Sequence, residues 1–372
     1  VIIGGLLIFV VGSVVAAIAD TMQGLILGRA LQGMGAIAST LMAMVTDLTS
    51  EQNRTKAMAS IGASIGLSFI LAMIAGPLIA SAMGLSGVFW VTALLGCIGI
   101  FVFVLLVPRV FSAQKNRETL ADLNQIGLLL KQPTLLRLNL GIFALHLALM
   151  AAFVVIPTML SGQLGFSGDD LWWVYLALLG GGFVAMLPVM ILSEKYQRQK
   201  LTFVSAIACM TVAMLVLGRE QGAMLTLAML LLFFAAFNLL EATLPSWLSK
   251  VCPAGSRGTA MGIYSTSQFM GAFVGGTLGG WSLQQFGITG VFLLVAVVLA
   301  FWWFLSLSLK SPRPLQTLVL QVGEMEHRDF VKIISNIVGV EDILVVKGES
   351  LAYAKVDKKT VDMTSIKPYL NR

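Results

Sequence analysis

Three ionisable side chains interrupt long apolar stretches of this 372-residue chain, and they indicate the chemistry that it could perform. Arg29, His146 and Glu241 each stand inside a run of about 20 mostly apolar residues. A charge in hydrocarbon is unfavourable by about 2.5 kcal/mol or more, so such residues usually face a cavity or a partner. Because histidine and glutamate can both take up a proton, we expect His146 and Glu241 to bind protons or a substrate within a bilayer.

Structural alternatives stay open for these groups. Glu241 lies about two helical turns from the polar end of its stretch, where an ion pair with Lys250 or Arg257 would be structural. His146 could instead be a histidine satisfied inside a packed core. Asp20 immediately precedes another apolar stretch, and we expect it to cap a helix.

The composition excludes a soluble globular protein. Hydrophobic residues make up 58% of the chain and charged residues only 11%, against about a quarter charged in ordinary soluble domains. Apolar runs and their breakers predict ten membrane-spanning helices before Lys310. They are Val1–Ala19, Gly24–Val45, Ala57–Ala82, Gly87–Val107, Thr134–Leu160, Leu171–Leu192, Leu201–Leu217, Ala223–Leu248, Thr259–Leu283 and Ile288–Leu309.

The basic residues of this apolar part lie almost entirely in alternate loops. The loops after the second, fourth, sixth and eighth helices hold twelve Lys and Arg, whereas the opposite loops hold only Arg219. Since cytoplasmic loops are enriched in positive residues, these loops and the C-terminal end of the chain are predicted to be cytoplasmic. The net charge of +6 is thereby explained, and no nucleic-acid partner is expected.

One offset, 203 residues, aligns the chain with itself without a gap over a long stretch. It places Arg54 on Arg257 and Gly76 on Gly279. It also places the run Gly84, Gly87, Val88 and Phe89 on Gly287, Gly290, Val291 and Phe292. The last four helices of two halves therefore correspond with the same orientation, which is typical of parallel repeats in transporters.

The second predicted helix carries a motif, L-x-x-x-R-x-x-Q-G-x-G, formed by Leu25, Arg29, Gln32, Gly33 and Gly35. Together with the repeat, it resembles the fourth helix of proton-coupled members of the major facilitator superfamily. The resemblance implies that Arg29, with Gln32 and Gly33, tunes the protonation of a nearby acid. The alternative is that Arg29 joins two helices by bonding backbone carbonyls.

Two further features gain meaning from this resemblance. The Gly76-Pro77 step, among small residues, resembles a degenerate antiporter motif that seals a helix against protons; the alternative is ordinary small-residue packing. Asp47, at the cytoplasmic end of its helix, resembles the acid of a charge lock between helices; the alternative is an acidic helix end in solvent.

The C-terminal stretch from Pro312 holds 17 of the 42 charged residues and is predicted to be a separate domain. Its pattern predicts the order strand, helix, strand, strand, helix, which favours a ferredoxin-like fold. It has no cysteine, so a metal-carrier role is not expected. The elements are Leu318–Val322, His327–Val338, Ile343–Lys347, Leu351–Val356 and Met363–Leu370.

The resemblance implies an all-α polytopic membrane protein of the major facilitator fold with ten of twelve helices present, plus this α+β domain. Residues 1–107 would be the last four helices of the N-terminal half, 108–133 a cytoplasmic central loop, 134–310 the six-helix C-terminal half and 311–372 the cytoplasmic ferredoxin-like domain. Two helices would precede Val1, so residues 1–372 alone are expected to catalyse no coupled flux.

The expected function is a proton-coupled antiporter of a bacterial inner membrane that exports small amphiphilic compounds by alternating access. The expected partners are the lipid bilayer, protons, a small-molecule substrate and, through the C-terminal domain, another copy of the chain. The chain has no phosphate-binding G-x-x-x-x-G-K-[ST] and no HExxH motif, so no enzyme activity and no cofactor are expected. Two alternatives stay open: the protein could be a symporter or facilitator for a sugar or metabolite, or a membrane sensor that signals through its C-terminal domain.

Overall fold

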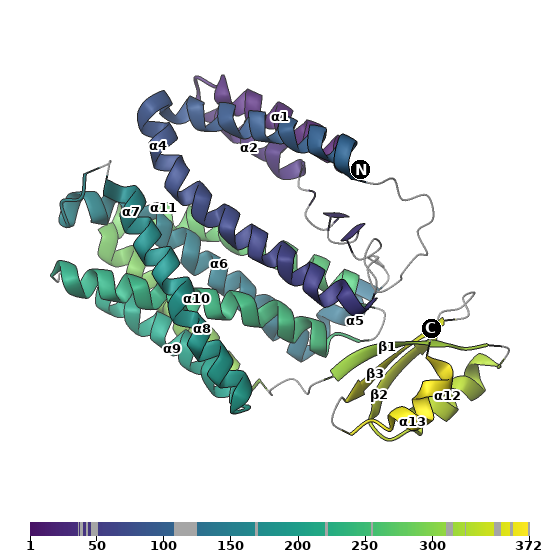
Figure 1. Cartoon of the computed structure of the whole chain (residues 1–372). Helices are drawn as coiled ribbons and strands as arrows, with labels where there is room; N and C mark the ends of the chain where they lie inside the picture. The colour runs from purple at the N-terminus through teal and green to yellow at the C-terminus, as the bar shows by residue number, and fades with distance from the viewer. Residues whose placement is uncertain are drawn as a thin grey trace. The chain divides into compact units, whose positions relative to one another are not determined.

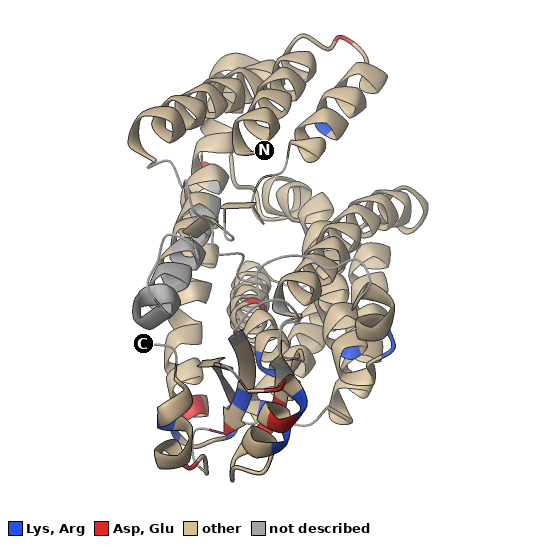
Figure 2. Ribbon diagram, turned by 90° about the vertical axis from the view of Figure 1, so that its right-hand side faces the viewer, with Lys and Arg blue, Asp and Glu red and all other residues tan. Residues whose placement is uncertain are grey.

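The computed structural model describes residues 1–35, 37, 40–41, 44–45, 51–107, 125–167, 170–219, 222–253, 256–309, 315–323, 325–345, 351–357 and 360–370. The chain divides into two compact units, Val1–Asn116 with Pro157–Gly181, and Arg117–Ile156 with Gly182–Arg372. The charged residues that Figure 2 colours on the ribbon are sparse on the long helices and gather on the C-terminal domain. This distribution agrees with an apolar membrane part and a separate polar domain.

The first unit is built from helices α1 (Ile2–Ala17), α2 (Met22–Met34) and α4 (Glu51–Leu106), where α1 packs against both of the others (Figure 1). Thr21 is the N-cap of α2, and its side-chain oxygen accepts a hydrogen bond from Gly24 N at 3.2 Å. The expectation that Asp20 caps this helix is therefore wrong by one residue. A short helix and two π-helical turns complete the unit: η2 (Met159–Gln163), α7 (Leu171–Tyr175) and η4 (Leu176–Gly180).

The second unit contains a bundle of long helices and the C-terminal domain (Figure 1). Helix α9 packs against both α10 and α11, and glycines bring α6 onto α11 and α8 onto α10. The helices are α5 (Ile126–Leu130), α6 (Pro133–Thr158), α8 (Gly181–Lys195), α9 (Gln199–Leu217), α10 (Ala223–Val251) and α11 (Arg257–Leu307).

Six helical stretches of the described chain are long and apolar enough to cross a membrane, and α1 is a shorter apolar helix. This number is lower than the ten predicted spans because α4 and α11 each hold two helices that meet at a kink, and because α1 and α2 are shorter than the spans predicted there. Helix α4 contains the third and fourth predicted spans, and α11 contains the ninth and tenth. The fold class predicted from the sequence, a polytopic helical membrane protein with a small C-terminal α+β domain, is confirmed.

Both joined helices turn at a single glycine, and the two glycines are equivalent in the 203-residue repeat. Gly84 in α4 has φ 70° and ψ −176°, and Gly287 in α11 has φ 66° and ψ −166°. A side chain strongly disfavours positive φ, so glycine is required at both kinks. The internal repeat inferred from the sequence thus recurs in backbone conformation.

The C-terminal domain has the predicted order of elements: β1 (Leu315–Gln321), α12 (His327–Ser335), β2 (Val340–Val345), β3 (Leu351–Asp357) and α13 (Met363–Ile366), followed by a 3-10 turn η5 (Lys367–Tyr369). The strands form an antiparallel sheet in the order β1-β3-β2. An isolated bridge joins Leu320 to Leu370 on the other side of β1. One face of the sheet and the helices enclose a core that includes Phe330, Ile334 and Ala354.

Replacing Gly287 by alanine tests the kink. Left-handed backbone costs a non-glycine residue about 1–2 kcal/mol, so Gly287→Ala should lower the thermal midpoint of the purified protein. Gly280→Ala in the same helix is the matched control, because a Cβ at either position meets no described atom within 4 Å. Alanine in a helix interior gains up to about 1 kcal/mol over glycine, so the control should keep or raise the midpoint. Equal shifts for both variants would contradict the assignment.

Candidate functional site

A polar cluster lies among the apolar helices of the second unit, where α6, α10 and α11 each contribute one side chain. Nε2 of Gln268 in α11 donates a hydrogen bond to Oε1 of Glu241 in α10 at 3.1 Å. The same nitrogen lies 2.8 Å from Nε2 of His146 in α6. His146 Nδ1 and Glu241 Oε2 are 3.8 Å apart. The two ionisable groups singled out in the sequence therefore lie together, bridged by an amide.

The side-chain amide of Gln268 determines which protonation states of His146 and Glu241 are favoured. A glutamine NH2 group has two hydrogens and no acceptor capacity, so Gln268 can donate to Glu241 and to His146 at once. His146 Nε2 then accepts, which places the proton of a neutral imidazole on Nδ1, the atom facing Glu241 Oε2. Gln268 therefore favours an ionised Glu241 beside a neutral His146.

The cluster keeps unused hydrogen-bonding capacity. Within the described residues, the buried atoms His146 Nδ1, Glu241 Oε2 and Tyr264 Oη have no hydrogen-bond partner. Tyr264 lies one helical turn before Gln268, so the two side chains share a face of α11. The His146 side chain is 12% exposed and that of Glu241 is 36% exposed, although the Oε2 atom of Glu241 is buried. This unpartnered carboxylate oxygen can take up a proton.

Close contact between α6 and α11 positions two of the three side chains. Gly271, Gly275 and Gly279 follow one face of α11, and a Cβ on them would lie 2.2, 2.3 and 2.8 Å from backbone atoms of Phe143, Leu147 and Ala151 in α6. Small residues allow helix backbones in a membrane to approach closely. These three glycines therefore serve the packing of α11 on α6, whereas a Cβ on Gly276 or Gly280 would meet no described atom within 4 Å.

In the part of the chain that the structure describes, Glu241 forms no ion pair with Lys250, and the side chain of Arg257 lies outside that part. Glu241 accepts a hydrogen bond from Gln268, and its Oε2 lies 3.8 Å from Nδ1 of His146. The ring of Phe237, one turn earlier in α10, packs edge-on against His146 with centroids 5.8 Å apart. Sequence reasoning missed Gln268 and Tyr264; the available signal was a glutamine inside the apolar stretch of α11.

A second polar chain runs between α1 and α2 in the first unit. Nη1 of Arg29 donates to Oε1 of Gln32 at 2.7 Å. Nε2 of Gln32 donates to Ser13 Oγ at 2.6 Å, and Ser13 Oγ donates to the carbonyl oxygen of Phe9 at 2.8 Å. Gln32 is buried and Arg29 is exposed. The contact that joins the helices is thus a side-chain relay through Gln32, and the sequence pattern did not predict the part that Ser13 plays in it.

Glycines also allow α1 and α2 to approach closely. A Cβ on Gly12 would lie 2.5 Å from Gln32 N, and one on Gly28 would lie 2.5 Å from Ala16 N. The pair Gly5 and Gly35 repeats this contact one heptad away on each helix. Because the backbones meet at Gly12, Gln32 reaches Ser13 with a short hydrogen bond.

Within the described residues, the structure shows no specific contact that supports the roles predicted for the remaining site residues. These residues are Gly33, Gly76, Pro77 and Asp47. A Cβ on Gly33 or on Gly76 would meet no described atom within 4 Å. Pro77 lies inside α4 and leaves that helix continuous around it. Asp47 lies outside the described residues. Their predicted roles in transport stay predictions.

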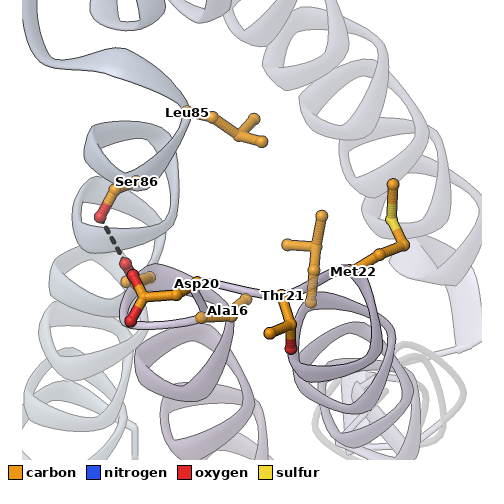
Figure 3. A pocket seen from close by; sticks show the side chains of 9 residues that line it. Ala16, Asp20, Thr21, Met22, Leu85 and Ser86 are labelled. Carbon is orange, nitrogen blue, oxygen red and sulfur yellow. Dashed lines mark hydrogen bonds between the residues drawn. The ribbon is translucent and has the colours of Figure 1, made fainter.

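A small pocket of about 180 Å³ lies where the α1–α2 turn meets α4 (Figure 3). Asp20, Thr21 and Ser86 contribute polar groups, and Ala16, Met22 and Leu85 contribute apolar ones. Ser86 Oγ donates a hydrogen bond to the carbonyl oxygen of Ala17, which ties α4 to α1. The lining contains no residue of either polar cluster, so this pocket is a separate feature of the first unit.

The chain belongs to the Major Facilitator Superfamily, whose sequence profile matches residues 1–275 and 138–346. The resemblance inferred from the repeat and the Arg29 motif is thereby confirmed, and the protein is a membrane transporter of this class. The chain is 42% identical over 368 residues to the inner membrane transport protein YajR of Escherichia coli K12, covering 98% of this chain and 81% of YajR.

More distant relatives extend this similarity. The uncharacterized transporter BU466 of Buchnera aphidicola is 34% identical over 275 residues, which cover 73% of this chain and 70% of BU466. The quinolone resistance protein NorA of Staphylococcus aureus is 22% identical over 311 residues, covering 80% and 76%. The crystal structure of the human organic anion transporter MFSD10 (TETRAN) has a similar fold, with a TM-score of 0.61 at 18% identity over 82% of this chain and 76% of that chain.

Alanine at Gly275 tests whether the α6–α11 contact positions the cluster. The new Cβ would lie 2.3 Å from the carbonyl oxygen of Leu147, so the helices must separate. Overpacking typically costs about 1–3 kcal/mol, and we expect a lower thermal midpoint for Gly275→Ala. Gly276→Ala is the matched control, because its Cβ meets no described atom within 4 Å. A midpoint for Gly275→Ala equal to that of Gly276→Ala would contradict a tight contact.

Proposed function

We propose that this transporter is a proton-coupled antiporter of a bacterial inner membrane, which exports small amphiphilic compounds in exchange for protons by alternating access. The observation that carries the proposal is the His146–Gln268–Glu241 cluster inside apolar helices. Ionisable residues within a membrane are expensive and usually functional. The named drug-resistance relative NorA adds support for an exported drug-like substrate.

Glu241 is the residue that would carry the exchanged proton. Its Oε1 accepts a hydrogen bond from Gln268, while its buried Oε2 has no partner in the described chain. A proton arriving at Oε2 neutralises the carboxylate without breaking the Gln268 bond. The neutral imidazole of His146 then keeps its own proton on Nδ1. Substrate and proton would therefore compete for the ionised state of Glu241.

Arg29 would supply the positive charge of the first half. Its guanidinium is held by Gln32, which is anchored on Ser13. Within its own unit, no described carboxylate forms an ion pair with Arg29. Its charge is therefore available to favour deprotonation of an acid during the transport cycle. In the same scheme Gln32 and Gly33 shape the Arg29 helix, and Gly76, Pro77 and Asp47 take the sealing and locking roles that the family resemblance implies.

The proposed domain arrangement follows the sequence boundaries. Residues 1–107 and 134–310 would belong to the two halves, 108–133 to the cytoplasmic loop between them, and 311–372 to a cytoplasmic domain of ferredoxin-like topology. The bridge from Leu370 to Leu320 supports that topology, since it lies at the edge of β1 where the last strand of a βαββαβ sheet would add.

Everted vesicles carrying the complete gene product test proton antiport directly. Adding cationic amphiphilic compounds should collapse an imposed pH gradient, measured with a fluorescent weak base. Glu241→Gln keeps the shape of the side chain but cannot titrate, so it should reduce this proton movement to the level of vesicles without the protein. Arg29→Ala should do the same, because the charge that favours proton release is lost.

Two further variants make the test specific. Glu241→Asp restores a titratable carboxylate and should recover part of the activity. Glu326→Gln is the same chemical change on an exposed residue of the C-terminal domain, and it should leave activity intact. Full activity in Glu241→Gln would refute the role of this acid. Protons moving in the same direction as the compound would show symport.

A further inference from the structure

The sheet of the C-terminal domain has buried side chains on both faces of its central strand, although the domain's own helices occupy only one face. Side chains alternate along β3, and Ala352, Ala354 and Val356 point into the core formed with α12 and α13. Tyr353 and Lys355 point to the opposite face, yet they are only 2% and 5% exposed. A small α+β domain normally leaves that face in water, so another part of the chain covers it.

Lys355 identifies one segment that covers this face. Its ammonium nitrogen lies 3.5 Å from the carbonyl oxygen of Ser249 and 3.1 Å from that of Lys250, and it also donates to the carbonyl of Cys252. These three carbonyls belong to the carboxyl end of α10 and its cap. The same nitrogen is 3.9 Å from Cys252 Sγ.

The chemistry of the two partners is complementary. The last carbonyls of a helix have no donor within the helix and carry a partial negative charge. A lysine ammonium has three donors and no acceptor, so it can bond three such carbonyls at once. The carbonyls at the end of α10 therefore compensate this buried charge.

We infer that the face of the sheet bearing Tyr353 and Lys355 is a docking surface for the carboxyl end of α10, and that Lys355 clamps the C-terminal domain onto the helix that carries Glu241. The clamp acts beyond a weak point of α10. Pro245 has no N–H, so the carbonyl of Glu241 lacks its usual donor four residues on. The segment from Pro245 to the clamp can thus pivot as a unit, and the domain controls that movement.

Cys252 reports whether the clamp is closed. It is 1% exposed and lies against Lys355. In full-length protein with Cys97→Ser and Cys209→Ser, purified in detergent so that both ends of the helices are accessible, Cys252 should react slowly with a maleimide. Lys355→Met keeps the apolar stem but removes the donors. Its labelling rate should rise at least about tenfold, because hydrogen bonds made by a charged group are among the stronger ones.

Two matched variants separate the clamp from general damage to the domain. Lys332→Met makes the same change on the exposed side of α12 and should keep the parent rate. Lys355→Arg keeps a donating cation and should label more slowly than Lys355→Met. Equal rates for the parent, Lys355→Met and Lys332→Met would overturn the inference, as would fast labelling of Cys252 in the parent.

Hydrogen exchange gives a second readout that needs no cysteine. Backbone amides of residues 246–252 should exchange faster in Lys355→Met than in Lys332→Met, because the end of α10 loses its external cap. Unchanged exchange in this segment would also overturn the clamp. Neither measurement depends on transport, so the outcome is independent of whether the protein is a proton antiporter.

Discussion

Close approach of helix backbones is the constraint on which the rest of this structure depends. In lipid there is no hydrophobic force between helices, so association rests on packing and on hydrogen bonds between them. Along α11 the glycines at 271, 275 and 279 let the backbone of α6 come within contact distance. Only then does the amide of Gln268 reach His146, and through Glu241 the same amide connects α10. In the first unit, Gly12 and Gly28 do the same for the relay from Arg29 through Gln32 to Ser13.

The two halves share a scaffold and differ in their chemistry. By the 203-residue offset, the helix that carries Arg29 corresponds to α10, which carries Glu241. Their ionisable residues are not equivalent, however, since Leu232 corresponds to Arg29 and Ala38 to Glu241. One half therefore presents a fixed positive charge and the other a titratable cluster. Under the proposed antiport, the fixed cation and the titratable acid would act from different halves of the protein.

Much of this arrangement could be predicted from the sequence. The membrane spans, the repeat and the order of elements in the C-terminal domain follow from local patterns. Arg29 and Gln32 are three residues apart on one helix, so their contact also follows from spacing. The pairing of His146 with Glu241 could not be predicted, because it depends on how three separate helices pack.

Two further features escaped sequence reasoning for different physical reasons. Gln268 carries no charge and stands beside Ser and Thr residues, so it resembled ordinary packing. Lys355 falls on the strand face that alternation assigns to solvent, and its burial depends on a tertiary contact with α10. The glycines at 84 and 287 were recognised as breaks between predicted helices, and in the structure each takes a positive φ at the kink where two helices meet.

The equivalent kinks at Gly84 and Gly287 also indicate which features of the protein arose first in its evolution. If the two halves descend from one duplicated segment, a left-handed glycine found at equivalent positions in both was already present in the ancestor. Arg29 and Glu241 have no counterparts in the opposite half, so they diverged after the duplication. The kinked pair of helices is then the older feature. The placement of a fixed cation in one half and a titratable acid in the other is younger, and it arose in a fold that already existed.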